Sequence, residues 1–136
     1  MDALKLRIDT GVRKIEVNDN GDYIMLQVAD QSVPWKLEKF FNDIKDKTAK
    51  LTELSGSEDN KEAFLELTYE LNVFAKESVD NIFGADTCKK ALGDIIPPFE
   101  MSLELANDLV QYFIEYAESR VKKLSKYSPD RMGSAE

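Results

Sequence analysis

Apolar and polar residues are patterned like paired strands near the N-terminus of this 136-residue chain. Residues 12–17 (VRKIEV) alternate between apolar and polar side chains, as a half-buried strand does, and residues 23–28 (YIMLQV) read as the partner strand. Residues 18–22 (NDNGD) between them tolerate left-handed backbone, so the pattern predicts a β-hairpin over about residues 12–28. A lone hairpin is marginal in water, so we expect it to lie on helices or to be extended by strands of another chain.

Helical spacing of apolar positions dominates the rest of the chain. It predicts long amphipathic helices over about residues 35–54, 57–83 and 99–127, and a short helix over 87–92. Ser57 and Thr87 are the expected N-caps of the second and the short helix. The fold class is therefore α+β, with a single domain over residues 1–127 and a flexible tail over residues 128–136.

The last long helix carries two apolar stripes where one would cover a core. The first stripe comprises Leu103, Ala106, Val110, Phe113, Ile114, Ala117, Val121 and Leu124. The second comprises Leu105, Leu109, Tyr112 and Tyr116. Two stripes indicate that the helix is sandwiched inside the domain, or that one of its sides meets another chain. The second stripe is our candidate partner-binding surface, since tyrosine is favoured at interfaces, and internal burial is the equally open alternative.

Charge adds a second candidate surface. The net charge is −8, and residues 53–83 hold eight acids against two bases. Glu62, Glu66 and Glu70 repeat at a spacing of four on one helix face, with Glu77 close to that face. Such a face is either a solvated surface or a docking stripe for a basic segment of a partner. The acidic balance argues against nucleic-acid binding.

Little in the chain is suited to catalysis or to metal binding. Histidine is absent, and Cys88 is the only cysteine, so we expect no enzyme, no cofactor, no small-molecule substrate and a structural thiol. Residues 16–27 match a calcium loop in the position of Gly21, but Gln27 stands where a bidentate glutamate is needed, so a plain hairpin turn is favoured over a metal site. Neither an export signal nor a membrane-spanning run is evident, so a location in the cytoplasm of the cell that makes the chain is expected.

Three segments carry a resemblance to a known family. Residues 12–24 (VRKIEVNDNGDYI), 79–84 (VDNIFG) and 88–90 (CKK) resemble small tail-region proteins of phages and prophages of Gram-positive bacteria, which are similar to tail assembly chaperones. The resemblance spans about residues 10–127 and brings no catalytic residues. It implies a non-enzymatic protein that binds the tape measure protein or tail tube protein, with self-association also expected.

Two other functions stay open on the sequence. An acidic inhibitor that imitates DNA would need acids spread over a continuous face, and the charge-neutral residues 1–52 weaken that interpretation. A structural virion subunit would use the hairpin to extend the sheet of a neighbour.

Overall fold

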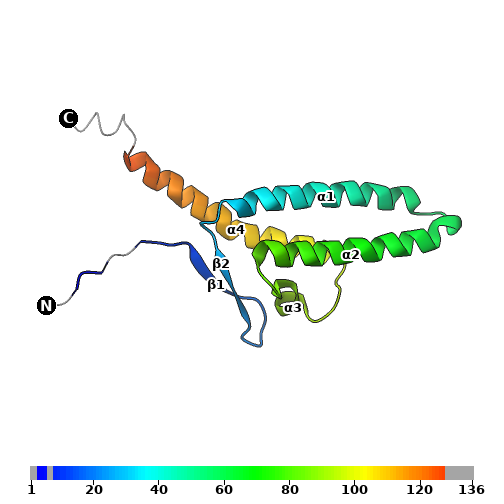
Figure 1. Ribbon diagram of the computed structural model, residues 1–136, viewed down its shortest axis with the longest axis horizontal. Coiled ribbons are helices and arrows are strands. Elements are labelled where there is room, and N and C mark those ends of the chain that lie inside the picture. The colour runs from blue at the N-terminus through cyan, green and yellow to red at the C-terminus, as the bar shows by residue number, and fades with distance from the viewer. Residues whose placement is uncertain (1–2, 6–7, 128–136) are drawn as a thin grey trace.

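The computed structural model describes residues 3–5 and 8–127, and it has the predicted α+β order of a hairpin followed by three long helices and a short one (Figure 1). Its elements are β1 (Val12–Glu16), β2 (Tyr23–Gln27), α1 (Ser32–Leu54), α2 (Lys61–Phe83), α3 (Thr87–Leu92) and α4 (Phe99–Leu124). One-turn 3-10 helices precede α2 at Glu58–Asn60 and follow α4 at Ser125–Tyr127. The predicted tail, residues 128–136, lies outside the described residues.

The hairpin is antiparallel and is fastened to the helices at its turn. The side-chain oxygen of Asn18 accepts hydrogen bonds from the backbone N–H groups two and four residues further on, at 2.7 and 3.3 Å. Gly21 has a φ of +86°, a conformation that favours glycine. The Asn18 amide nitrogen donates to the carbonyl oxygen of Lys90 in α3 at 2.8 Å. The turn is thus tied to the helical body by a contact 72 residues apart in the sequence.

The sheet covers the body through one face. Ile24, Leu26 and Val28 point inward and are buried, whereas Tyr23 and Met25 between them are about half exposed. This alternation is what a period of two requires of a strand with one wet face. The body supplies the support that a two-stranded sheet lacks by itself.

Helices α1 and α2 form an antiparallel pair (Figure 1). The two halves of this pair differ in burial. Next to the hairpin the helices share a core made by Leu37, Phe40, Ile44, Leu71, Ala75, Val79 and Phe83. Between Ile44 and Leu71 no residue is buried, and the apolar side chains of Phe64 and Leu67 are only half-buried there. Residues 45–70 therefore project from the body as a two-helix extension, which we call the arm.

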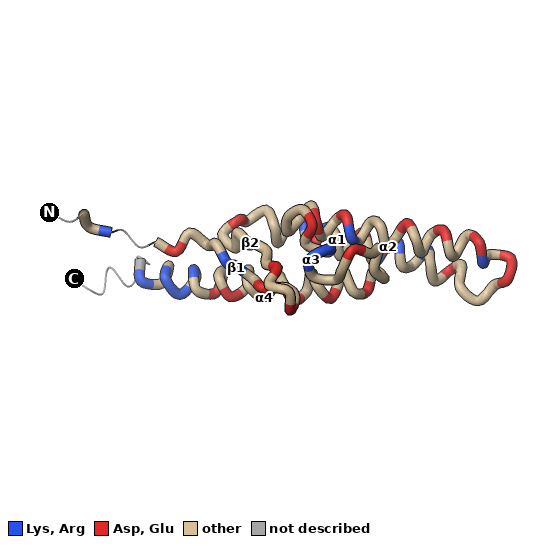
Figure 2. Tube along the Cα trace, turned by 90° about the horizontal axis from the view of Figure 1, so that it is seen from below, with Lys and Arg blue, Asp and Glu red and all other residues tan. Residues whose placement is uncertain are grey.

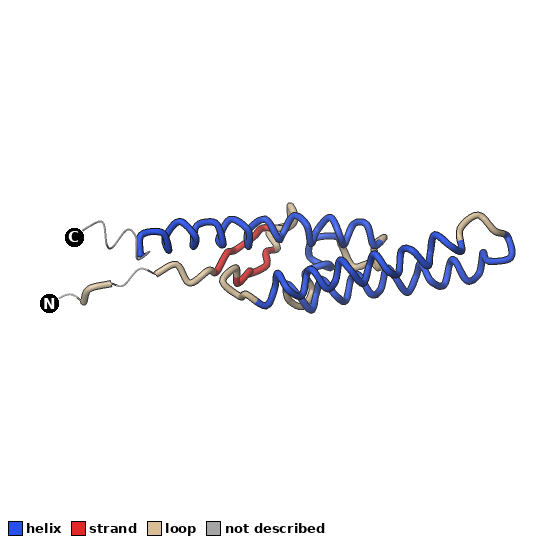
Figure 3. Tube along the Cα trace, turned by 90° about the horizontal axis from the view of Figure 1, so that it is seen from above, coloured by secondary structure: helices blue, strands red, loops and turns tan. Residues whose placement is uncertain are grey.

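Helix α4 lies along the body half of α2 and runs in the same direction (Figure 3). It begins where the Phe99 N–H donates to the side-chain oxygen of Asn72 at 2.8 Å. Fourteen residues later Phe113 packs on Phe83, with ring centroids 6.1 Å apart. The register between α2 and α4 is thus set by one polar contact and one aromatic contact.

Burial along α4 follows a line that runs between the two predicted stripes. The buried side chains are Ser102, Ala106, Leu109, Phe113 and Tyr116. This line draws two residues from each stripe, so the expectation of two parallel apolar faces is corrected to one core face with half-buried edges. Beyond it, all residues from 117 to 126 are exposed. We call residues 117–127 the α4 tip, and this segment lies at the opposite end of the molecule from the arm (Figure 3).

Two predicted N-caps are wrong. Ser57 precedes the 3-10 helix at residues 58–60 and makes no side-chain cap hydrogen bond, and Asn60 stands at the N-cap of α2. Thr87 is the first residue of α3, and its hydroxyl donates to the carbonyl oxygen of Gly84 at 2.7 Å. The left-handed Asp86, with a φ of +65°, occupies the N-cap instead. Both helices begin at tight turns whose backbone geometry the sequence pattern does not encode.

Among the described residues, no helix combines the length and the apolar character needed to cross a membrane.

Candidate interaction surface

A groove of about 360 Å³ runs between β1, α3 and the first half of α4. Apolar side chains from all three elements line it: Ile15, Val17, Ala91, Leu92, Met101, Leu105, Leu109 and Tyr112. Leu109 is 3% exposed, whereas Leu105 and Tyr112 are half-buried and keep part of their surface free. The groove is therefore an apolar surface that the chain leaves incompletely covered.

Acidic side chains accompany this apolar lining. Glu16 of β1 and Glu104 and Asp108 of α4 are exposed and line the groove, and no lysine or arginine is among the lining residues. A surface with an apolar floor and three carboxylates fits an apolar segment flanked by basic residues.

Tyr116, predicted to belong with Leu105, Leu109 and Tyr112, lies outside the groove lining. It is 7% exposed and packs under Arg13 of β1, whose guanidinium carbon is 5.8 Å from the centre of its ring. Tyr116 thus helps to attach the hairpin to α4, and only the other three residues of the predicted surface face the groove.

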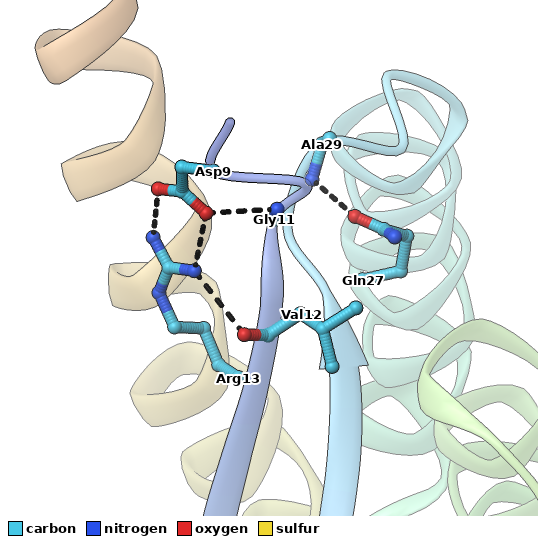
Figure 4. A network of polar contacts seen from close by, with 6 residues as sticks. All are labelled: Asp9, Gly11, Val12, Arg13, Gln27 and Ala29. Carbon is cyan, nitrogen blue, oxygen red and sulfur yellow. Dashed lines mark hydrogen bonds and ion pairs between the residues drawn. The ribbon is translucent and has the colours of Figure 1, made fainter. Parts of the chain in front are cut away.

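The guanidinium of Arg13 also closes a polar network with Asp9 (Figure 4). Its two terminal nitrogens donate to the two carboxylate oxygens of Asp9 at 3.0 and 2.8 Å, and the Gly11 N–H donates to the same carboxylate at 2.9 Å. These hydrogen bonds, that of Arg13 foremost, hold the pKa of Asp9 well below its usual range. The network fixes the segment before β1 rather than forming a binding site.

The four predicted acidic residues of α2 are all exposed, but they do not line the groove. Glu62, Glu66 and Glu70 lie on the arm, and Glu77 lies on the body half of α2. Figure 2 shows acidic residues gathered toward the end of the arm. The two predicted partner surfaces are therefore separate parts of the molecule.

Cys88 is fully buried, and burial, supported by the nearby Asp80 carboxylate, raises the pKa of its thiol to about 11. A nucleophilic cysteine needs the opposite shift. Its backbone N–H donates to the Asp80 carboxylate at 2.9 Å, and its thiol donates to the carbonyl oxygen of Lys76 at 3.8 Å. These contacts give Cys88 a place in the packing between α3 and α2.

The part of the chain that the structure describes contains no cluster of three or more metal-ligating side chains. In the hairpin turn, the side chain of Asn18 hydrogen-bonds to the backbone, to Lys90 and to the carboxylate of Asp22 at 2.7 Å. The residues that match a calcium loop are thus occupied in shaping the turn.

Eight groove residues escaped prediction: the apolar Ile15, Val17, Ala91, Leu92 and Met101, and the acidic Glu16, Glu104 and Asp108. The alternation along residues 12–17 does place Ile15 and Val17 on one strand face, which was the only sequence pattern that pointed to them. Their meeting with α3 and α4 depends on how the hairpin is docked, which no local pattern specifies.

Comparison of the chain with protein-family models, with curated proteins and with solved structures finds no match.

Proposed function

We propose that this chain is a non-enzymatic binding protein of the phage tail assembly chaperone type, and that its groove holds a segment of a tape measure or tail tube protein. The observation that carries the proposal is the apolar groove with its acidic residues, which the chain leaves open. The resemblance of residues 12–24, 79–84 and 88–90 to tail-region proteins supplies the kind of partner.

The chemistry of the groove defines the segment that fits. Leu105, Leu109 and Tyr112 offer apolar contacts along one side of α4, suited to an amphipathic helix that inserts residues at spacings of three and four. Glu16, Glu104 and Asp108 favour Lys or Arg on both flanks of that apolar face. Tape measure proteins are long and helical, so they offer many such faces.

The DNA-mimic alternative receives less support. It needs acids spread over a continuous surface, whereas the α4 tip holds four bases against one acid, Glu118. Figure 2 shows these bases gathered at the end of the molecule opposite the arm.

The DNA that flanks this coding region provides the first test. A long helical reading frame beside tail tube genes supports the proposal and names the protein to co-express. An isolated gene among defence or host-takeover genes contradicts it.

Co-purification with that neighbour then tests the groove. Leu105→Asp and Tyr112→Asp each place a charge in the apolar lining at a half-buried site, so we expect the fold to persist and partner capture to fall by about tenfold or more. Met25→Asp also replaces an exposed apolar side chain by a carboxylate, but on β2, outside both the groove and the α4 tip, and serves as the control. Undiminished capture by both folded groove variants would refute the site.

A further inference from the structure

The two ends of this elongated molecule carry opposite charge (Figure 2). Residues 53–70 at the end of the arm hold six acids and one base, a net charge of −5. Residues 119–127 in the α4 tip hold four bases and no acid, a net charge of +4. Charges of opposite sign at the two ends of a rod favour contact between the end of one copy and the opposite end of another.

The α4 tip also presents an unpartnered apolar seam. Ile114, Ala117, Val121 and Leu124 follow one another at spacings of three, four and three, which places them on one face of the helix. Ile114, Val121 and Leu124 are 44%, 66% and 59% exposed. No other element of the described chain covers this seam, although it has the pattern of a helix that packs against other helices.

The arm leaves a complementary apolar surface uncovered, because it consists of two helices, whereas the body has a third helix, α4, packed on α2. Leu65 and Tyr69 are 58% and 59% exposed. They lie on the same α2 stripe as Asn72 and Lys76, since residues spaced by four, three and four share a helix face. In the body that stripe holds the segment leading into α4, through the Asn72 contact with Phe99 and a 2.8 Å hydrogen bond from Lys76 to the carbonyl oxygen of Ile95.

The two exposed segments have similar lengths. Residues 61–70 of α2 precede its first buried residue, Leu71, and residues 117–124 of α4 follow its last buried residue, Tyr116. At 1.5 Å per residue these ten and eight residues span about 15 and 12 Å, and the 3-10 turn at residues 125–127 adds about 6 Å to the α4 tip. Because α2 and α4 run in the same direction within one chain, a copy displaced along the long axis can place its α4 tip on the next arm with that same polarity.

We propose that copies of this chain associate head to tail, with the α4 tip of one copy lying on the arm of the next and completing a three-helix layer there. The apolar seam of the tip packs on Leu65 and Tyr69, while its lysines and arginine face the acids of the arm. A head-to-tail contact joins different surfaces, so it continues into an open chain or closes into a ring. Three turns of helix bury less than the roughly 1,600 Å² of a standard stable interface, so the association is weak and depends on concentration. The groove is not used, and this proposal goes beyond the proposed function.

Charge reversal at either end tests the contact with the full-length chain. The tip variant carries Lys122→Glu and Lys123→Glu, and the arm variant carries Glu62→Lys and Glu66→Lys. Glu104→Lys with Asp108→Lys makes the same charge change as the arm variant on α4, within the groove, and is the matched control. Sedimentation velocity over micromolar to millimolar protein gives the mass-average size, and circular dichroism confirms that each variant is folded.

We expect the wild-type mass to rise above the 15.5 kDa of one chain with concentration, and to fall back toward it in about 1 M salt, where the Debye length is about 3 Å. Each end variant alone should lose about tenfold or more in association constant, and the groove control should associate as the wild type does. An equimolar mixture of the tip and arm variants should regain association, because each reversed end then meets a complementary one.

Three results would overturn the proposal. A wild-type chain that stays monomeric at millimolar concentration has no such contact. An arm variant that associates like the wild type points to pairing between two α4 tips instead. Folded tip and arm variants that remain monomeric when mixed show that their charges do not meet. If association is confirmed while the groove variants still capture the tail partner, only the proposed function is lost.

Discussion

Gly11 occupies a position that only glycine fits, for two separable reasons. Its φ is +85°, and it lies beside Ala29 and the side chain of Gln27 (Figure 4). A Cβ atom built on Gly11 would lie 2.6 Å from Oε1 of Gln27, 2.7 Å from Cβ of Ala29 and 2.8 Å from the backbone nitrogen of Ala29. Left-handed backbone costs a residue with a Cβ about 1–2 kcal/mol. Contact with the Ala29 backbone adds about 1–3 kcal/mol, since backbone cannot rotate away as a side chain can. Alanine also lowers the conformational entropy of the unfolded chain relative to glycine, and this offsets about 0.4–1 kcal/mol of the loss in stability.

Gly11→Ala should therefore lower the free energy of unfolding by about 2–4 kcal/mol, a large share of the 5–15 kcal/mol of a typical domain. Gly21 provides the matched control, because its φ is +86° but nothing lies within 4 Å of a Cβ built there. Gly21→Ala should cost only about 1 kcal/mol, from the left-handed backbone alone.

Urea unfolding followed by far-UV circular dichroism measures both changes. The midpoints should shift in the order Gly11→Ala, then Gly21→Ala, then wild type, with a common slope. Equal midpoints for the two variants would refute the close approach of Ala29, and a Gly11→Ala variant as stable as the wild type would refute the left-handed turn before β1.

Three further changes probe the packing of the helices. Burial raises the pKa of Cys88 from its ordinary 9.0 to about 11, so the thiol of the unfolded chain loses its proton at a lower pH than the thiol of the folded chain. The free energy of unfolding should therefore fall by on the order of 1–3 kcal/mol as the pH rises from 9 to 11, and this decrease, measured by urea unfolding, should be smaller in Cys88→Ala. The buried hydroxyl of Ser102 lies near the Cys88 thiol, a weak hydrogen-bonding group, and makes no hydrogen bond of standard geometry among the described residues. Ser102→Ala should therefore raise the free energy of unfolding by about 1 kcal/mol, and a lower melting temperature would show that the contact with Cys88 is worth more than the hydroxyl loses by burial. Asn72→Ala removes the acceptor of the Phe99 N–H and should cost about 1–2 kcal/mol by urea unfolding; no loss would mean that the contact does not anchor the start of α4.

Local patterns predicted the elements well because their causes are local. The hairpin expected at residues 12–17 and 23–28 is found at Val12–Glu16 and Tyr23–Gln27, with Gly21 in its turn. The helix ends at Leu54, Phe83 and Leu92 also coincide with the expected ones, since glycine follows within two residues in each case. Helix starts were predicted less accurately. The expected cap Ser57 precedes a 3-10 helix at Glu58–Asn60 instead of α2, and no residue in the sequence marks the change from one helix type to the other.

The candidate surface was only partly predictable, since it depends on contacts between distant segments. Periodicity put Tyr116 and Leu105 on one stripe, yet Arg13 of the hairpin covers the first and leaves the second at the groove. The buried line of α4 includes Ser102, a polar residue that an apolar pattern passes over. The stagger of α4 against α2 follows from the contact of Asn72 with Phe99, 27 residues apart, and no local spacing encodes it.

Because α2 is buried unevenly, the backbone amides in its two halves should exchange hydrogen with solvent at different rates. Its amides on the arm can exchange with solvent through local opening of the helical pair, since no buried side chain between Ile44 and Leu71 has to be exposed. The amides from Leu71 to Phe83 are held by the shared core and exchange only when much of the domain unfolds. Hydrogen exchange should therefore show a step in protection near Leu71, within an unbroken helix, and any chain that covers the arm should slow exchange on the outer side of that step.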